Sequence, residues 1–286
     1  MGEKIVSLRK KPDASVLRAI ELVRDGEADA VVAVGNTMAA VAGSALRLKT
    51  IEGVHRPGIA VPLPSKSGTT IVIDMGANTT PKPEHLVDYA IMASVYSRQI
   101  LGVEAPRVGL LNVGEELGKG NPMLRSAYEL LQDAPVDFVG NVEGDDIYAG
   151  TCDVVVCDGF VGNAVLKASQ AVVELIVQFL KEELKRNLRR KTGALLSRPA
   201  FNALRRRTDY AEFGGAPLLG VNGVVIIGHG KSNARAVQNA LRVARDAAAR
   251  GVNEKIRTRL EALGDPSTDG PERGGTASHP GDREAV

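Results

Sequence analysis

Short runs of β-branched residues recur along the chain, and each ends in glycine, asparagine or aspartate. The four clearest runs lie at 30–34, 70–73, 108–113 and 153–157. None of these runs alternates with polar residues, which is typical of strands that are buried on both faces, as in a parallel sheet.

Helical periodicity fills the intervals between these runs. Apolar residues recur at three-to-four spacing over five segments, which are 13–25, 38–48, 83–101, 121–132 and 231–250. Asp13 and Pro83 suit the first turn of a helix. The alternation of strands and helices predicts an α/β fold with an open, doubly wound, mostly parallel sheet.

A long amphipathic segment stands apart from this alternation. From Asn163 to about Arg190 the apolar positions predict one long helix, and its end is strongly basic. Leu195, Leu196 and Phe201 follow between further cations, so the region of about 163–208 resembles a protruding helical hairpin with an apolar tip. Such a tip can lie on an anionic membrane surface, but a solvated basic face or a dimer contact explains the same residues.

Composition narrows the functional classes. Of 286 residues 44% are hydrophobic and 24% are charged, and the net charge is only +2, so neither disorder nor a general affinity for nucleic acid is indicated. Tryptophan is absent, while Cys152 and Cys157 are the only cysteines and lie in an apolar run. We therefore expect core cysteines in a reducing compartment, with no metal site and no cofactor. No stretch resembles a membrane span or a secretory signal, so a cytoplasmic location is expected.

Glycine-containing polar loops follow each predicted strand. In open α/β sheets ligands bind beyond the carboxyl ends of the strands, where glycine turns and helix N-termini expose backbone N–H groups to anions such as phosphate. Glycines that only supply tight turns are the alternative for any single loop. Because several loops at this edge also carry Asn, Asp or Glu, we expect a phosphate site here.

Seven motifs make the pattern specific enough to suggest a family. They occur in order at 35–37, 74–78, 82–86, 110–116 with 119–121, 138–144, 158–163 and 210–220, and the likeness extends from about residue 5 to about residue 260. Together they resemble the bacterial phosphate acyltransferases of the PlsX family.

The resemblance implies an enzyme of phospholipid synthesis that transfers a fatty acyl group from acyl carrier protein to inorganic phosphate. It implies a Rossmann-like α/β/α sandwich of the isopropylmalate dehydrogenase type, a homodimer, and a helical hairpin that holds a cytoplasmic enzyme at the membrane surface. The glycerol-3-phosphate acyltransferase that acts downstream is a further expected partner.

Acyl transfer from a thioester to phosphate needs a phosphate cradle, a donor for the carbonyl oxygen and an apolar channel, but no covalent enzyme intermediate. Lys119 lies in a glycine-flanked loop after a strand, and we expect it to bind phosphate or to stabilise the oxyanion. Asn163 can donate an N–H to the same centre at a helix N-terminus, although a plain N-cap is the alternative.

Other polar residues are candidates for binding or positioning. Asn36, Asp74, Asn78 and Asn141 lie at neighbouring strand ends, where they could orient loops or contact substrate. Arg56 could bind phosphate or the phosphopantetheine of a carrier protein, or merely cover a loop. His85 and His229 are the histidines near motifs, and each could act as a general base or proton donor. For His85 a structural role is favoured, and for His229 both roles remain possible.

Two departures from the family pattern leave other functions open. The family begins with a strand and a Met-Gly-Gly-Asp loop, and this chain is expected to start after them; Met38 replaces a usual glycine.

We expect one α/β domain over 1–263 and a disordered tail over 264–286. The alternatives are an impaired remnant that keeps membrane or carrier-protein binding, a phosphotransacetylase-like acyl-CoA enzyme, and an NAD-dependent dehydrogenase, for which no Gly-x-Gly-x-x-Gly is present.

Overall fold

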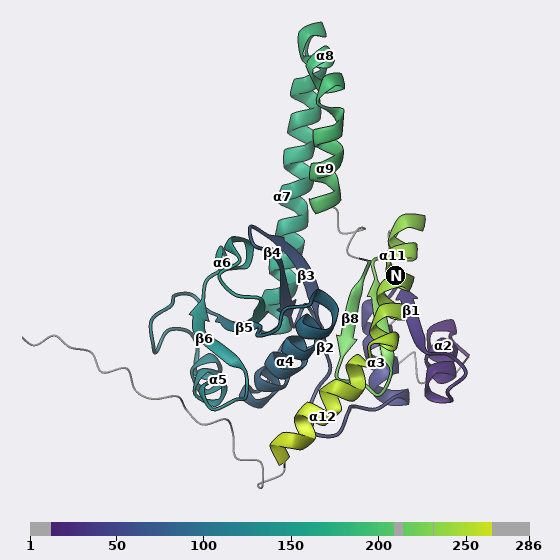
Figure 1. The fold of residues 1–286 in the computed structure, drawn as a ribbon, viewed down its shortest axis with the longest axis vertical. Coiled ribbons are helices and arrows are strands. Elements are labelled where there is room, and N and C mark those ends of the chain that lie inside the picture. Colours follow the sequence, from purple (N-terminus) through teal and green to yellow (C-terminus); the bar gives the residue numbers. More distant parts are fainter. Residues whose placement is uncertain (1–12, 209–213, 231, 265–286) are drawn as a thin grey trace, which may run out of the picture.

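The computed structural model describes residues 13–208, 214–230 and 232–264. Strands in these ranges form a four-stranded and a five-stranded sheet with helices around them, and a helical hairpin projects from this body (Figure 1). The strands are β1 (Ala30–Val34), β2 (Gly58–Ile59), β3 (Val61–Ser65), β4 (Gly68–Ile73), β5 (Arg107–Leu111), β6 (Asp137–Val142), β7 (Val154–Val156), β8 (Ala216–Leu219) and β9 (Val224–Gly228).

The five-stranded sheet has the order β3-β4-β7-β5-β6, and only the β3–β4 pair is antiparallel. Its centre consists of three strands that the apolar runs predict. Val154, Val155 and Val156 of β7 are fully buried between helices, as expected for a central parallel strand. The predicted mostly parallel α/β class is therefore confirmed.

The four-stranded sheet has the order β1-β9-β8-β2. Strand β1 pairs in parallel with β9, from Ala30 opposite Val224 to Val34 opposite Gly228, so the first and the last strand of the described chain are neighbours in one sheet. The apolar runs predict one continuous sheet, and the structure instead has two, because β1 pairs with this distant strand and not with β4.

The helices are α2 (Ser15–Arg24), α3 (Thr37–Arg47), α4 (Pro83–Tyr96), η1 (Ser97–Leu101, a π-helical turn), α5 (Pro122–Gln132), α6 (Asp146–Ala149), α7 (Gly159–Lys185), α8 (Leu188–Leu196), α9 (Arg198–Thr208), α11 (Ala234–Ala249) and α12 (Val252–Gly264). The five predicted helices correspond to α2, α3, α4 with η1, α5 and α11. Helix α12 is not predicted, and it contains Gly264; the rest of the predicted tail lies outside the described residues.

The long helix differs from its predicted span at both ends. Helix α7 begins at Gly159 and not at Asn163, because Asp158 caps it. It ends at Lys185, and the Asn187 side chain then accepts a hydrogen bond from the Arg190 backbone N–H at 2.9 Å and caps α8. The predicted hairpin of about 163–208 is therefore three helices over 159–208, in which α8 packs against α7 and α9 runs back toward the body (Figure 1).

Two hydrophobic clusters draw residues from both sheets. One contains Ile73 of β4 and Leu219 of β8 around helix α4, and the other contains Val155 of β7 and Val225 of β9. Helix α4 is apolar on nearly all sides, as a helix between packed layers must be. The sheets therefore share their cores, while the predicted single domain over 1–263 stays a prediction.

Candidate functional site

The turn after β4 is organised by Asp74, whose carboxylate is fully buried. Its Oδ1 accepts hydrogen bonds from the backbone N–H groups of Ile59, Gly76 and Ala77 at 2.9, 3.1 and 3.0 Å, and its Oδ2 accepts from Asn78 N–H at 2.6 Å. Burial raises the pKa of Asp74, and these donors oppose that rise. Because four backbone groups occupy this carboxylate, Asp74 fixes the turn and does not offer a free group to substrate.

Asn78 is similarly engaged within the protein. Its Nδ2 donates to the Pro57 carbonyl oxygen and to Tyr89 Oη, both at 2.7 Å. Tyr89 is fully buried in α4, and its burial raises its pKa well above the usual value for tyrosine. The Asn78 side chain therefore joins the Asp74 turn to α4 and to the segment before β2.

Helix α7 begins directly against this turn. Its N-cap, Asp158, accepts hydrogen bonds from the backbone N–H groups of residues 160 and 161, both at 2.9 Å, while Gly159 N–H donates to Asn78 O at 2.8 Å. A Cβ on Gly159 would lie 2.5 Å from Asp74 Oδ2, and one on Gly162 would lie 2.0 Å from Asp74 O. Only glycine allows the helix to approach the turn so closely.

Asn163 is the fifth residue of α7, so the interpretation of Asn163 as a plain N-cap is wrong. Asp158 takes that role because its side chain is the one before the first helical turn. Asn163 lies over the Asp74 turn: a Cβ on Gly76 would be 3.5 Å from Asn163 Cβ and 3.8 Å from its Oδ1. The Asn163 side chain is exposed and has no hydrogen-bond partner within the described residues, so its amide is available to a ligand.

Two asparagines hold the loop after β5. Asn112 Nδ2 lies 3.1 Å from Asn141 Oδ1 and 3.2 Å from the Lys119 carbonyl oxygen, and Asn141 Nδ2 donates to Glu116 O at 3.3 Å. The Lys119 side chain itself is half-exposed, with Nζ 3.7 Å from Glu116 Oε2. The loop backbone is therefore tied down at strand ends, while the Lys119 ammonium keeps only a weak, exposed ion pair.

The sheet order brings these features to one edge. Strand β7 lies between β4 and β5, with Val156 opposite both Ile73 and Leu110. Since the three strands are parallel, the Asp74 turn, the start of α7 and the Lys119 loop leave the sheet side by side at its carboxyl edge. Lys119 and Asn163 therefore follow adjacent strands.

Asn36 and His229 belong to the other sheet. Asn36 caps α3 after β1, where its Oδ1 accepts from Ala39 N–H at 3.1 Å, and His229 follows β9, the neighbour of β1. Met38, in the first turn of α3, is exposed. The described contacts do not join Asn36 or His229 to the Asp74 turn; that turn meets the four-stranded sheet through Ile59 of β2, whose O accepts from Met75 N–H at 3.0 Å.

A histidine that sequence motifs do not reveal lies beside Arg56. The His55 backbone N–H donates to Asp88 Oδ2 at 2.9 Å, and His55 Nδ1 lies 2.9 Å from the same oxygen. The His55 and His85 ring centroids are 5.7 Å apart. Burial, and after it the neighbouring His55, lowers the pKa of His85, while burial raises the pKa of Asp88. Arg56 is exposed and has no ion pair among the described residues, so it stays a candidate for binding an anion.

The two cysteines are buried, and the described residues hold neither an activated thiol nor a metal-binding cluster. Cys152 and Cys157 are buried and unpaired, which confirms that they are core residues. Burial raises the pKa of Cys152 to about 11 and raises that of Cys157 as well, so neither thiol is an activated nucleophile. The described residues contain no cluster of three His, Cys, Asp or Glu side chains that could hold a metal ion.

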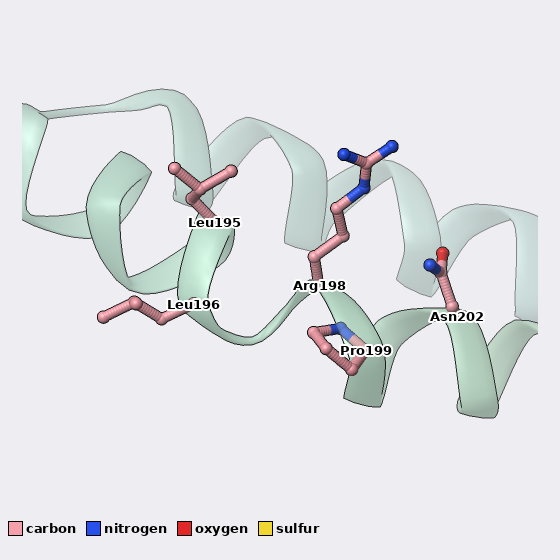
Figure 2. A pocket seen from close by; sticks show the side chains of 5 residues that line it. All are labelled: Leu195, Leu196, Arg198, Pro199 and Asn202. Carbon is pink, nitrogen blue, oxygen red and sulfur yellow. The ribbon is translucent and has the colours of Figure 1, made fainter.

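Exposed large apolar side chains are concentrated along the hairpin. Leu195 and Leu196 are strongly exposed at its tip, beside Arg198, Pro199 and Asn202, with which they line a shallow depression (Figure 2). Phe201 is half-buried. Below the tip, large apolar side chains of α7 are also exposed: Val172, Val173, Leu175, Ile176, Val177, Phe179 and Leu180.

By length and composition alone, α7 could cross a membrane. An 18-residue window of α7 has a mean hydropathy of 1.4, and 6% of that window is buried in the protein. The sequence pattern predicts no membrane span, so the length and composition of α7 depart from that expectation. One helix of this kind is weak evidence, and an apolar face that meets a second protein copy has the same composition.

Comparison with known proteins gives a consistent result. The family described as "Fatty acid synthesis protein" matches residues 1–255. The chain is 51% identical over 243 residues to a phosphate acyltransferase from Desulforudis audaxviator, covering 85% of this chain and 72% of that protein. It is 48% identical over 263 residues to a phosphate acyltransferase from Aquifex aeolicus, covering 92% of this chain and 78% of that protein. The crystal structure of a phosphotransacetylase from Streptococcus pyogenes covers 92% of this chain and 71% of its own, with a TM-score of 0.54 at 16% identity, which shows a shared fold.

Proposed function

This chain belongs to the fatty acid synthesis protein family, and we propose that it is an enzyme that transfers a fatty acyl group from acyl carrier protein to inorganic phosphate. The observation that carries the proposal is the 51% identity over 243 residues to a protein named phosphate acyltransferase. The product, acyl phosphate, would serve phospholipid synthesis and pass to a glycerol-3-phosphate acyltransferase.

The geometry at the carboxyl edge supports this chemistry. A phosphate oxygen attacks the thioester carbonyl carbon, the C–O bond forms and the C–S bond breaks. The leaving thiolate takes up the proton that the hydrogen phosphate carried. Phosphate is already an anionic nucleophile at neutral pH, so the protein has mainly to hold both reactants and to stabilise the carbonyl oxygen as it becomes negative. The Lys119 ammonium and the Asn163 amide are the available groups at this edge, and the N-terminal end of α7 adds a positive potential.

The remaining candidates support these two residues. Asp74 and Asn78 shape the turn beneath Asn163, and Asn141 holds the loop that carries Lys119. We assign them positioning roles, because their side chains are hydrogen-bonded to backbone and side-chain partners within the protein. Arg56 and His229 are kept as candidates for binding the phosphate or the phosphopantetheine arm.

The decisive experiment measures release of free carrier protein from acyl carrier protein with and without phosphate. Phosphate-dependent release with formation of acyl phosphate is expected, and its absence from folded protein would reject the proposal. Lys119→Ala should lower kcat by about a hundredfold or more while the fold persists.

The matched control is Lys66→Ala. Lys66 is an exposed loop lysine at the β3–β4 turn, at the opposite end of β4 from Asp74. The Lys66→Ala variant should keep the parent's phosphate-dependent activity. Acyl-CoA in place of the carrier thioester tests the phosphotransacetylase-like alternative: equal or faster release from acyl-CoA would change the assigned donor.

The hairpin supports a second part of the proposal, that the enzyme is a cytoplasmic homodimer at an anionic membrane surface. Leu195 and Leu196 would insert at the lipid boundary between cations such as Arg190 and Arg198, while the exposed face of α7, including Ile176, would be covered by a second copy.

Liposome flotation and light scattering separate these two contacts. Leu195→Asp with Leu196→Asp should abolish flotation with anionic vesicles and keep the dimer. Ile176→Asp should weaken the dimer instead. Unchanged flotation of the double variant would reject the membrane contact, and a monomeric parent chain would reject the dimer.

A further inference from the structure

Exposed apolar side chains flank both residues to which we assign catalysis. In the Lys119 loop, Val113 is 78% exposed and Leu117 is 75% exposed, and at the start of α7, Phe160 is 68% exposed. Outside α8, α9 and residues 172–185 of α7, these are the three most exposed large apolar side chains among the described residues. Large exposed apolar groups that cluster near a site are typical of ligand-binding surfaces.

Their positions along the chain bring them to the same edge. Strands β5 and β7 pair in parallel with Leu110 opposite Val156, and neighbouring strands lie about 4.8 Å apart. Val113 comes three residues after Leu110, and Phe160 comes four residues after Val156. The two apolar groups therefore stand on adjacent segments that leave the sheet together.

Each also has a fixed relation to its polar neighbour. Phe160 and Asn163 are three residues apart in α7, so their side chains share one face of the helix. Leu117 precedes Lys119 by two residues within a loop whose backbone is held by Asn112 and Asn141. Apolar surface thus begins where the charged and amide groups end.

We propose that Val113, Leu117 and Phe160 form the surface that binds the alkyl chain of the acyl group, starting from the carbonyl held at Lys119 and Asn163. The inference rests on the proposed function, since it is that reaction which requires an alkyl chain to leave the reacting carbonyl at this edge. A chain lying on these side chains removes its methylenes and theirs from water, so binding strengthens as the acyl group lengthens.

The first test is the dependence of kcat/KM on acyl length, measured with octanoyl, dodecanoyl and hexadecanoyl carrier thioesters at saturating phosphate. Each buried methylene contributes at most about fourfold, so the parent enzyme should favour the longer chains. Phe160→Ala and Leu117→Ser should each flatten this preference, with a loss of about tenfold for hexadecanoyl and little loss for octanoyl. The KM for phosphate should stay constant.

The matched control is Leu46→Ser. Leu46 is an exposed leucine, 51% accessible, near the C-terminal end of α3, which lies at the opposite edge of its sheet from the strand carboxyl ends. This variant should keep the parent's length preference. An equal loss at every chain length in the Phe160 and Leu117 variants, or a changed oligomeric state, would overturn the proposal.

A second measurement does not depend on turnover. The chain contains no tryptophan, so Phe160→Trp introduces a single fluorescent reporter at the proposed surface. Titration with a dodecyl thioether of pantetheine, which cannot react with phosphate, should shift its emission to the blue, while Leu46→Trp should not respond. A silent Phe160→Trp reporter would refute the alkyl surface even if phosphate-dependent transfer is found. A response without any transfer would support the surface and reject the proposed reaction.

Discussion

Replacing Asp74 should separate a structural role from a catalytic one. The buried carboxylate accepts four backbone hydrogen bonds, three on Oδ1 and one on Oδ2. Asp74→Ala would leave all four N–H groups without an acceptor, and a buried unsatisfied donor costs about 1–3 kcal/mol. The donors share one turn and can relax together, so the sum overstates the loss. We therefore expect a loss of about 4 kcal/mol, at the low end of the sum for four donors, which is a large part of the total stability of a typical domain.

Asp74→Asn is the informative partner variant. The Asn oxygen can keep the three bonds on Oδ1, while its NH2 group would face the Asn78 N–H, where two donors cannot pair. This variant should lose about 1–3 kcal/mol and remain folded at room temperature. Asp25→Asn, at an exposed aspartate that pairs with Arg24, is the control and should leave the urea midpoint essentially unchanged, because solvent screens this ion pair.

Urea unfolding followed by circular dichroism measures these differences, and phosphate-dependent transfer is assayed on the same samples. The expected order of stability is parent, Asp74→Asn, then Asp74→Ala, with a residual rate in Asp74→Asn. A fully stable but inactive Asp74→Asn would refute the positioning role, because only a proton-transferring or substrate-binding carboxylate behaves in this way.

Three further predictions follow from the same geometry. Gly159→Ala should destabilise the start of α7 and lower activity, because its Cβ would lie 2.5 Å from Asp74 Oδ2; unfolding in urea at the parent's midpoint would contradict the packing. The pKa of His85 is lowered from its usual 6.5, so the folded chain binds fewer protons than the unfolded chain and its stability falls as the pH drops below about 6.5. His85→Gln should make the unfolding free energy depend less steeply on pH in this range. Cys152 and Cys157 should react with a thiol reagent only after unfolding, and rapid modification of the native protein would show that they are not sealed in the core.

Local signals in the sequence were enough to predict the central elements. The valine run predicts β7 because an uninterrupted apolar stretch is typical of a strand buried on both faces. Pro83 predicts the start of α4 because proline fits the first turn of a helix, and both signals lie within a few neighbouring residues. The start of α7 could also have been found, since Asp158 before Gly159 is a good N-cap. The Gly162–Asn163 pair predicts a helix start one turn later than the observed one at Gly159.

Long-range partners could not be predicted in the same way. The split into two sheets depends on β1 pairing with β9, and nothing in the β1 sequence specifies which parallel neighbour it will have. The His55–Asp88 pair joins residues 33 positions apart, and neither residue belongs to a recognisable local motif. The β1–β9 pair packs against α3 and α11, and the His55–Asp88 pair depends on where α4 packs, so neither contact is contained in a local stretch of sequence.

The hydrogen bonds of each polar side chain show which candidates hold the site and which can contact substrate, a distinction that the sequence alone does not give. Asp74, Asn78 and Asn141 are the same kinds of residue at the same edge as Asn163, and each could have contacted phosphate. Their side-chain atoms are instead occupied by partners within the fold, and freeing them for substrate would leave backbone groups unpaired. Asn163 has no such obligation among the described residues, and Lys119 has only a weak ion pair with Glu116, so these two can change partners as charge develops on the substrate. The residues that hold the site and the residues that act in it are therefore distinguished by what each would lose on binding.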